Sequence, residues 1–483
     1  MGRMVVFVLF CAAGLPATMC AQNLVSDAAI IFSTDKGMLI RDTGSLFTIR
    51  DIVINGNERT KNSIILRELP FGVDEAHPLD FITSKFYETQ QRLMNTGLFR
   101  SVVVSLNSIS GKDVLVRIDV EEKWYLYPLP FVRVVEGKFG KWWNEKGRDL
   151  NQLNYGIRFT QNNATGRNDR IQLHVMNGYT KQLSLDYSGL YLDKDLKWYT
   201  NLALAYGKNR EINYVTQNNK LVPFKNPSGY IRTFSRATLD LAYRPAIKTR
   251  HTFSVGYFTD RIADTVYKLN RNFSNAPLQR FVTVGYNLSY TDLDFIPYPT
   301  KGVLGDFTFS KVGFTPTMNL WQLSAKTSLF KPVGKSFFNL KLAGMVKLPF
   351  RQPFSQQDFI GRSDMFLQGY EDYIIDGVAG GYTKLAFVHP VINTAIKVPN
   401  IAITKKLRII NPVPLKVYAK AFTNVGYVHN PNVTPANDLN NKMLYSGGFG
   451  LDIVAFTDLV VKLEWSFNQL GQNGLYLHQR ERY

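Results

Sequence analysis

The sequence predicts a transmembrane β-barrel of about sixteen antiparallel strands, preceded by one small α+β domain. From Trp124 to the C-terminus, runs of roughly ten residues alternate apolar and polar side chains, as the wall of a membrane barrel requires. After the first residues, no stretch of the sequence is apolar over the ~18 residues that a membrane helix needs. Ahead of the alternating region, residues 47–124 combine two helical segments with three strand segments.

The first residues have the pattern of a secretory signal. The apolar run Met4–Leu15 follows a positive residue and precedes small residues, so we expect residues 1–21 to be a signal peptide. Lipidation at Cys20 is the alternative. Cys11 and Cys20 are the sequence's two cysteines, so we expect no disulfide and no cysteine metal site after cleavage. Residues 22–46 are polar and unpatterned, which indicates a flexible lead-in.

Residues 47–124 predict a compact domain. Thr60 is suited to cap the first helix, and Gly97 marks the end of the second. The turn Ser110–Asp113 joins the last two strands. The predicted elements are, in order, strand Phe47–Ile54, helix Lys61–Leu69, helix Asp80–Leu98, strand Ser101–Leu106 and strand Val114–Val120.

This order of elements resembles a POTRA domain. The resemblance also rests on Ile54-Asn55-Gly56-Asn57 and on Thr96-Gly97-Leu98-Phe99 ahead of a Val-rich strand. It implies a periplasmic domain whose sheet edges pair with extended strands of clients or partners. A generic α+β domain stays open as the alternative for residues 47–124.

The barrel is predicted over residues 125–483, which also carry the positive charge. The whole chain has a net charge of +19, whereas residues 47–124 are nearly neutral. A broadly positive surface or lumen favours lipid phosphates or an anionic passenger as partners. Nucleic acid is not expected as a partner of an exported protein. Clear alternating runs lie at residues 171–175, 238–243, 252–257, 284–290 and 415–422.

The lengths of the connections fix the orientation of the predicted strands. If the small domain is periplasmic, the long connections 208–233 and 261–279 are extracellular, and the short turns 244–250 and 331–335 are periplasmic. The long irregular segment 348–380 is then the sixth extracellular loop. Residues 390–412 are an exception, because this long and basic connection falls on the periplasmic side; an inserted docking segment and a solvated loop both stay open for it.

Residues 47–483 resemble the outer-membrane protein assembly superfamily, of the BamA/TamA type, whose barrels are also called bacterial surface antigens. Members carry an Arg-Gly-Phe/Tyr motif in the sixth loop, which folds into the lumen so that its Arg meets an acid on strand thirteen. The matching motifs in this chain are Leu367, Gln368, Gly369 and Tyr370 with Asp376 and Gly377 in the loop, Phe422, Asn424 and Gly426 on a strand, and Pro299, Thr300, Lys301 and Gly302 at a strand start.

Both members of the family's ion pair differ in this chain. Gln368 stands where the resemblance implies an Arg, and Asn424 stands where it implies an Asp. One charged residue left alone in the lumen would be costly, whereas two amides can exchange hydrogen bonds. We therefore predict a Gln368–Asn424 contact inside the lumen. The alternative is that the two are unrelated polar residues.

The resemblance implies an outer-membrane assembly factor, with client strands templated at a lateral seam between the first and last barrel strands. Its partners would be unfolded outer-membrane proteins, outer-membrane lipids and periplasmic or lipoprotein accessory subunits. A two-partner-type secretion pore is the first alternative, and a passive porin or receptor is the second. The closing strand is predicted over Gly474–Tyr483.

No pattern in the sequence supports an enzyme, and no cofactor or metal is expected. The six histidines are scattered, and His389, His429 and His478 are predicted to lie at strand ends near the membrane interface. Asp292 and Asp294 form a carboxylate pair, but the prolines that follow them predict a turn role rather than acid–base chemistry.

Overall fold

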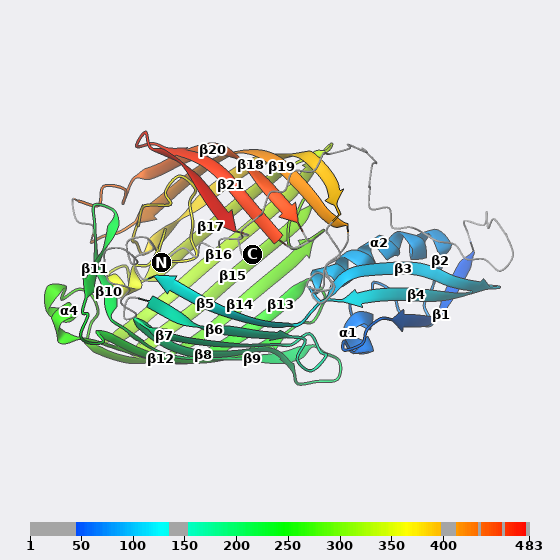
Figure 1. The fold of residues 1–483 in the computed structure, drawn as a ribbon, viewed down its shortest axis with the longest axis horizontal. Helices are drawn as coiled ribbons and strands as arrows, with labels where there is room; N and C mark the ends of the chain where they lie inside the picture. The colour runs from blue at the N-terminus through cyan, green and yellow to red at the C-terminus, as the bar shows by residue number, and fades with distance from the viewer. Residues whose placement is uncertain (1–44, 135–152, 398–411, 433–435, 456–458, 480–483) are drawn as a thin grey trace.

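The computed structural model describes residues 45–134, 153–397, 412–432, 436–455 and 459–479. The predicted signal peptide, the lipidation alternative at Cys20 and nearly all of the lead-in lie outside the described residues. The described chain forms a small mixed domain and a large antiparallel barrel, which lie end to end (Figure 1).

The small domain is a four-stranded sheet with two helices. Its sheet order is β2-β1-β4-β3, in which β1 and β4 are parallel and β3 and β4 form an antiparallel hairpin. Alternating apolar residues of the strands and one face of the longer helix bury a common core that includes Ile49, Ile82, Phe86 and Val116. The elements are β1 Leu46–Asn55, α1 Asn62–Leu66, β2 Ala76–Pro78, α2 Leu79–Asn95, β3 Phe99–Ser110 and β4 Asp113–Glu122.

Three details of this domain differ from the sequence prediction. Thr60 does not cap α1, whose N-cap is Lys61, because the Thr60 hydroxyl faces Tyr125 Oη and Asn163 Nδ2. The helix is correspondingly shorter than predicted. The short strand β2 carries no alternation that the sequence could reveal, and it pairs with the start of β1. Gly97 does follow the end of α2 as predicted, and its left-handed φ of +75° is readily adopted by glycine.

The barrel sheet has sixteen strands, all joined to their chain neighbours in antiparallel ladders, which confirms the predicted fold class. Side chains such as Leu239, Leu241, Phe253 and Val255 are exposed on the outer wall, where alternate residues face lipid. The strands are β5 Leu126–Val134, β6 Leu153–Asn162, β7 Arg170–Gly178, β8 Thr180–Tyr191, β9 Trp198–Asn209, β12 Arg232–Tyr243, β13 Thr249–Ile262, β14 Leu278–Leu293, β15 Gly302–Thr315, β16 Met318–Val333, β17 Ser336–Leu348, β18 Ala379–Ile396, β19 Val413–His429, β20 Met443–Ala455, β21 Leu459–Asn468 and β22 Asn473–Gln479.

Long connections gather at the end of the barrel that lies away from the small domain (Figure 1). They include the hairpin of β10 (Glu211–Gln217) and β11 (Lys220–Lys225), the helix α4 (Asp264–Leu269) and the short 3₁₀ turn Phe354–Gln356. Counted with the short turns at the same end, from the connection of β5 to β6 onward, the segment 349–378 between β17 and β18 is the sixth connection, as predicted. The prediction of a long periplasmic connection over residues 390–412 is partly wrong. Residues 390–396 belong to strand β18, which continues to Ile396. Residues 398–411 lie outside the described part of the chain.

Within the described ranges, no helix is both long enough and apolar enough to cross a membrane.

Candidate functional site

The connection 349–378, which we call the lumenal loop, packs against the inner face of the barrel wall. Its apolar side chains Phe359, Leu367 and Tyr370 are almost completely buried. They form one cluster with inward residues of the wall, which include Val428 on β19 and Leu444 on β20. A loop with this much buried apolar surface is held by the hydrophobic effect in the same way as a core element. Long connections of this kind usually form a solvent-exposed loop tip. In this chain the connection is packed inside the barrel instead.

Two glycines of the predicted motifs allow the close approach of loop and wall. Gly369 has a φ of +87°, and a Cβ at this position would lie 2.7 Å from Ser446 Cβ. Gly426 on β19 faces Leu367 of the loop, whose Cδ2 would lie 3.2 Å from an added Cβ. The carbonyl oxygen of Gly369 accepts a hydrogen bond from Asn468 Nδ2 at 2.7 Å. The loop therefore reaches across the wall as far as β21.

The predicted Gln368–Asn424 contact is wrong in its partners. Gln368 Nε2 donates to Glu464 Oε1 on β21 at 3.0 Å, and Asn424 Nδ2 donates to Ser446 Oγ at 3.0 Å. Ser446 in turn donates to the main-chain oxygen of Gln368. The two amides thus share a neighbour on β20 but do not bond to each other, because the side chain of Gln368 extends toward the later strand. Asn424 Oδ1 is buried and has no hydrogen-bond partner among the described residues.

Glu464 belongs to a buried group of charged side chains on the last four strands. Lys420 Nζ on β19 lies 2.5 Å from Glu464 Oε1 and 2.5 Å from Asp452 Oδ1 on β20. All three side chains are at most 5% exposed. Buried charges of this kind persist only when they are paired and hydrogen-bonded. The inward position of Lys420 was not singled out from the sequence, although its place two residues before Phe422 on the same face could have indicated it.

His478 on β22 joins this group from the last strand. Its Nδ1 contacts Glu464 Oε2, and its Nε2 lies 3.7 Å from Glu371 Oε1 of the lumenal loop. His478 therefore faces the lumen, and the prediction of an interfacial histidine is wrong at this position. The Glu371 side chain is fully buried, and neither of its carboxylate oxygens has a hydrogen-bond partner among the described residues. Burial raises the pKa of the Glu371 carboxyl.

The second half of the loop motif is fixed by another ion pair. Arg362 Nη1 lies 2.8 Å from Asp376 Oδ1, and the other oxygen of Asp376 accepts from Thr216 on the hairpin of β10 and β11. Gly377 lies against Val428, whose Cγ1 would be 2.3 Å from an added Cβ. Burial raises the pKa of Asp376, although the Arg362 guanidinium opposes this shift. The sequence motif contained Asp376 but not its partner, since Arg362 lies before the motif.

The predicted strand-start motif, Pro299 to Gly302, lies in the turn between β14 and β15. Asp294 accepts from the main-chain N–H of Thr300 at 3.0 Å and from its hydroxyl at 2.5 Å, which agrees with the turn role expected for this carboxylate. The turn carries Tyr298 inward, and Tyr298 Oη donates to Asp452 Oδ2 at 2.9 Å. Asp452 also contacts Lys420, so the turn touches the buried charged group.

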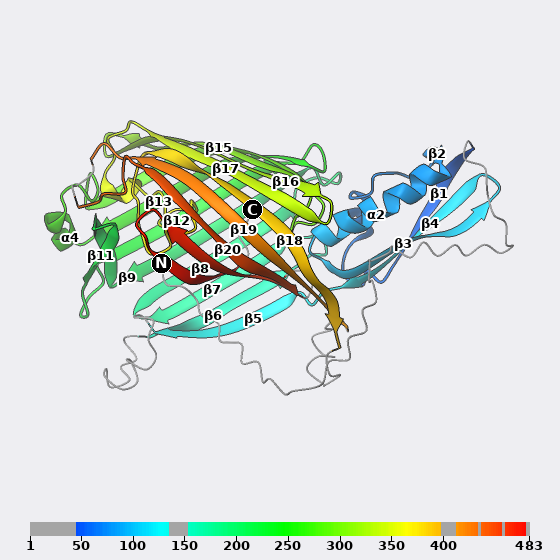
Figure 2. The same ribbon diagram turned by 90° about the horizontal axis from the view of Figure 1, so that it is seen from above.

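The small domain contacts the same turn and the neighbouring barrel rim. Asn95, at the end of α2, accepts at Oδ1 from Ile296 N over 2.9 Å, and Figure 2 shows this end of α2 at the rim. Glu68 receives two bonds from Arg244, at 2.8 and 3.1 Å. Burial acts to raise the pKa of Glu68, but its hydrogen bonds and charge interaction with Arg244 hold it below the usual value. The domain is therefore docked by directed polar contacts.

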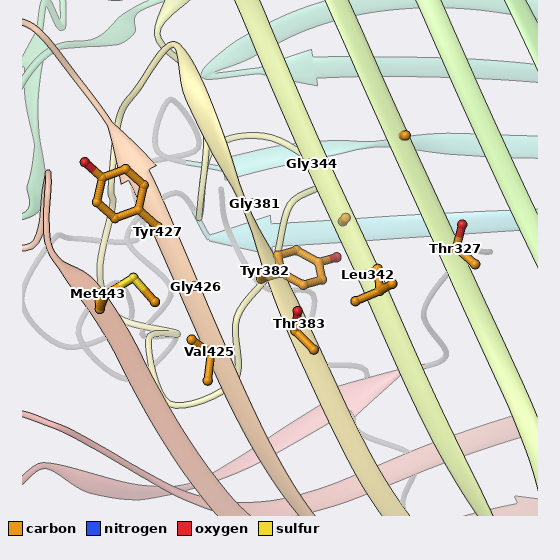
Figure 3. A pocket seen from close by; sticks show the side chains of 12 residues that line it. Thr327, Leu342, Gly344, Gly381, Tyr382, Thr383, Val425, Gly426, Tyr427 and Met443 are labelled. Carbon is orange, nitrogen blue, oxygen red and sulfur yellow. The ribbon is translucent and has the colours of Figure 1, made fainter.

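A shallow pocket of about 430 Å³ lies on the outer wall, over the strands that hold the lumenal loop (Figure 3). Gly344 on β17 and Gly381 on β18 are directly opposite each other, and Leu342 and Thr383 form the next cross-strand pair on the same face of the sheet. The absence of side chains at the two glycines creates the hollow. The pocket contains no charged lining residue. Within the described ranges, no three His, Cys, Asp or Glu side chains are placed to hold a metal ion.

Comparisons with known proteins agree with this architecture. The model of the Omp85 superfamily domain matches residues 163–455, and the POTRA model, described as the surface antigen variable number repeat, matches residues 47–123. The outer membrane protein assembly factor BamA of Neorickettsia risticii (strain Illinois) is 24% identical over 272 residues, which are 55% of this chain and 32% of that protein. The chain thus matches about a third of the length of this curated relative.

Two solved structures are similar to this chain. BamA from Haemophilus ducreyi lacking POTRA domains 1–3 has a TM-score of 0.49 at 15% identity, covering 90% of this chain and 83% of that one. CdiB from Acinetobacter baumannii has a TM-score of 0.44 at 12% identity, covering 89% and 74%.

The sixteen-stranded barrel, the docked periplasmic-type domain and the loop held in the lumen define an outer-membrane barrel with a POTRA domain in the periplasm. Because the family model covers more than half of its sequence, the chain belongs to the Omp85 superfamily.

Proposed function

We propose that this Omp85 protein inserts unfolded β-barrel proteins into the outer membrane, with client strands templated at the seam, meaning the free edges of β5 and β22. The observation that carries the proposal is the open sheet. Sixteen strands are joined in order from β22 to β5, yet among the described residues no ladder joins β5 to β22. Unpaired N–H and C=O groups at such edges recruit extended strands.

Hydrogen bonds between the extracellular connections support insertion over passage through the lumen. The hairpin of β10 and β11 is bonded to the lumenal loop, since Ile374 N donates to Asn219 O at 2.8 Å. Asn219 also bonds to Asn437 and Asp438 of the connection between β19 and β20. A secretion pore or porin would have to break these contacts for each molecule that passes, whereas entry into the membrane at the seam leaves them intact.

The partners that we propose are unfolded outer-membrane proteins and the surrounding lipids, with the POTRA domain receiving clients from periplasmic or lipoprotein accessory subunits. We also propose that the protein has no enzymatic activity, because the buried carboxylates of Asp376, Asp452 and Glu464 are engaged with Arg362, Lys420 and His478 rather than open to a substrate.

Reconstitution tests this proposal. The full chain in liposomes should accelerate the insertion of an unfolded model barrel protein over empty liposomes, read as the appearance of the folded, protease-resistant form. An equal rate in both preparations would refute the proposal.

Depletion in cells separates the alternatives. An assembly factor should lower many outer-membrane barrel proteins together. Loss of one exported protein with normal barrels would instead indicate a secretion pore, and a change in small-molecule permeability alone would indicate a porin.

A further inference from the structure

Two lysines face each other on neighbouring strands of the outer wall. Lys181 on β8 and Lys208 on β9 are direct cross-strand partners. Both side chains point outward, because Leu183 and Tyr206 are exposed on the outer wall and residues two apart in a strand share a face. Like charges directly opposite each other destabilise a sheet, so this pair calls for a compensating anion.

A third cation and one aromatic ring join the two lysines. Lys181 Nζ lies 6.0 Å and Lys208 Nζ lies 5.8 Å from the centre of the Tyr230 ring, just ahead of β12. Arg210 Cζ lies 5.3 Å from the centre of the same ring. An aromatic ring attracts cations but carries no net charge, so the repulsion among the three remains. We call Lys181, Lys208 and Arg210 the outer cationic cluster.

The outer cationic cluster keeps its positive charge. Among the described residues, none of its three side chains forms an ion pair with a carboxylate. Glu211, the next residue after Arg210, lies 3.8 Å from Lys225 and accepts from Tyr179 Oη. Arg210 Nη1 donates to the main-chain oxygen of Pro227, and its Nε is buried without a hydrogen-bond partner in the described part of the chain.

The outer cationic cluster lies above the apolar belt of the barrel. β8 begins and β9 ends at the extracellular end, away from the POTRA domain (Figure 1). The next outward residues along these two strands, toward the middle of the membrane, include the exposed side chains of Leu183, Leu185 and Leu204. Cations placed just beyond an apolar belt lie at the level of the lipid headgroups.

A further cation lies in the same row of the wall. Thr233 on β12 pairs with Lys208 on one side and with Arg261 on β13 on the other. Arg261 is exposed and, within the described ranges, has no carboxylate partner. The positive surface therefore extends along the extracellular rim from β8 to β13.

We propose that the outer cationic cluster binds the phosphate groups of lipids in the outer leaflet. The two ammonium groups and the Arg210 guanidinium donate to phosphate oxygens, and a phosphate between the lysines turns a repulsive pair into a stabilising contact. The acyl chains of the same lipid lie on Leu183 and Leu204. A free phosphate ion would match the charge but leave this apolar surface unused. The inference needs the outer-membrane location and is independent of client insertion.

Lipid titration tests the inference. The full chain, folded in a neutral detergent, is titrated with lipid A or with dephosphorylated lipid A, and binding is measured by native mass spectrometry. We expect binding of lipid A to be much the tighter. Lys181→Gln and Lys208→Gln should each weaken it roughly fivefold. Lys331→Gln, which changes an exposed lysine near the opposite end of β16, is the matched control and should leave the affinity unchanged.

Thermal unfolding gives a second readout, which a purely structural role of the lysines would not produce. In neutral detergent without lipid A, Lys208→Gln removes a like-charge pair and should unfold at a higher temperature than the unchanged chain. With lipid A present the order should reverse, because the variant has lost a phosphate contact. Heat-modified gel mobility checks that each variant is folded.

Equal affinities of the folded chain for lipid A and dephosphorylated lipid A would overturn the inference. An unchanged affinity for lipid A in the folded Lys181→Gln, Lys208→Gln double variant would do the same. Inorganic pyrophosphate is the third arm: if it raised the unfolding temperature as much as lipid A does, the cluster would be a site for a free ion rather than for a lipid, which would also refute the proposal.

Discussion

The side-chain amide of Gln368 and the ammonium group of Lys420 converge on one carboxylate oxygen, Glu464 Oε1, at 3.0 and 2.5 Å. In the family pattern, the positive charge belongs to the loop and meets an acid on the wall. In this chain the loop offers an amide, and the wall supplies both the cation and the acids. The lumenal loop therefore still bonds to the barrel wall, but the positive charge lies on the wall instead of on the loop.

The contact of Gln368 with Glu464 predicts non-additive substitutions. Gln368→Ala should lower the free energy of unfolding by about 1.5–3 kcal/mol, since the lost bond is to a charged acceptor. In a double-mutant cycle with Glu464→Gln, measured by urea unfolding in lipid vesicles, the two effects should not add. The matched cycle of Gln368→Ala with Asn424→Ala should be nearly additive, because Ser446 bonds to the main chain of Gln368. Additivity in the first cycle would contradict the contact.

Lys420 is expected to be the most sensitive member of the buried charged group. Lys420→Met leaves Asp452 and Glu464 buried without their cation and should cost about 3–5 kcal/mol in the same unfolding assay. Adding Asp452→Asn and Glu464→Gln to this variant should recover a large part of the loss, because the uncompensated charges are then gone. If the triple variant were no more stable than Lys420→Met, the cost would have to come from packing instead.

The buried Glu371 predicts a dependence of loop attachment on pH. Its raised pKa means that the folded state binds the proton more tightly than the unfolded state. The ionised carboxylate therefore weakens the loop at neutral pH, and this penalty should disappear as the pH falls through the raised pKa. We expect the hydrogen-exchange protection of residues 366–376, taken relative to the intrinsic exchange rate at each pH, to be greater at mildly acidic pH. Glu371→Gln should show the greater protection already at neutral pH; an unchanged pH dependence of protection in this variant would exclude Glu371 as the cause.

The bond between Glu68 and Arg244 predicts the opposite pH dependence for the POTRA domain. The pKa of the Glu68 carboxyl is lowered in the folded protein. Its ionised form therefore stabilises the docked domain above the ordinary glutamate pKa of about 4.3. This stabilisation is lost as the pH falls through the lowered pKa of the folded state. Proteolysis between the POTRA domain and the barrel should therefore accelerate below about pH 4.3. Glu68→Gln should be cleaved faster at neutral pH, with Glu121→Gln, whose partner Arg100 lies in the same domain, as the control. Equal cleavage of the two variants would show that the Glu68–Arg244 bond does not hold the domain.

The sequence alone determined the architecture, because the relevant signals are local. Period-2 alternation depends only on which side of a strand each residue faces, so residues such as Thr252–Tyr257 identify the wall without any partner. Loop lengths determined which connections are extracellular. Gly369 and Gly426 were likewise found from motifs, and the structure supplies the reason, which is the close approach of loop and wall.

The partners across the lumen were decided only by the tertiary structure. Gln368 reaches Glu464, 96 positions later, because the register of the last three strands brings that carboxylate beside the loop, and no local pattern encodes the register. For the same reason Lys420, Arg362 and His478 were not recognised as members of the site.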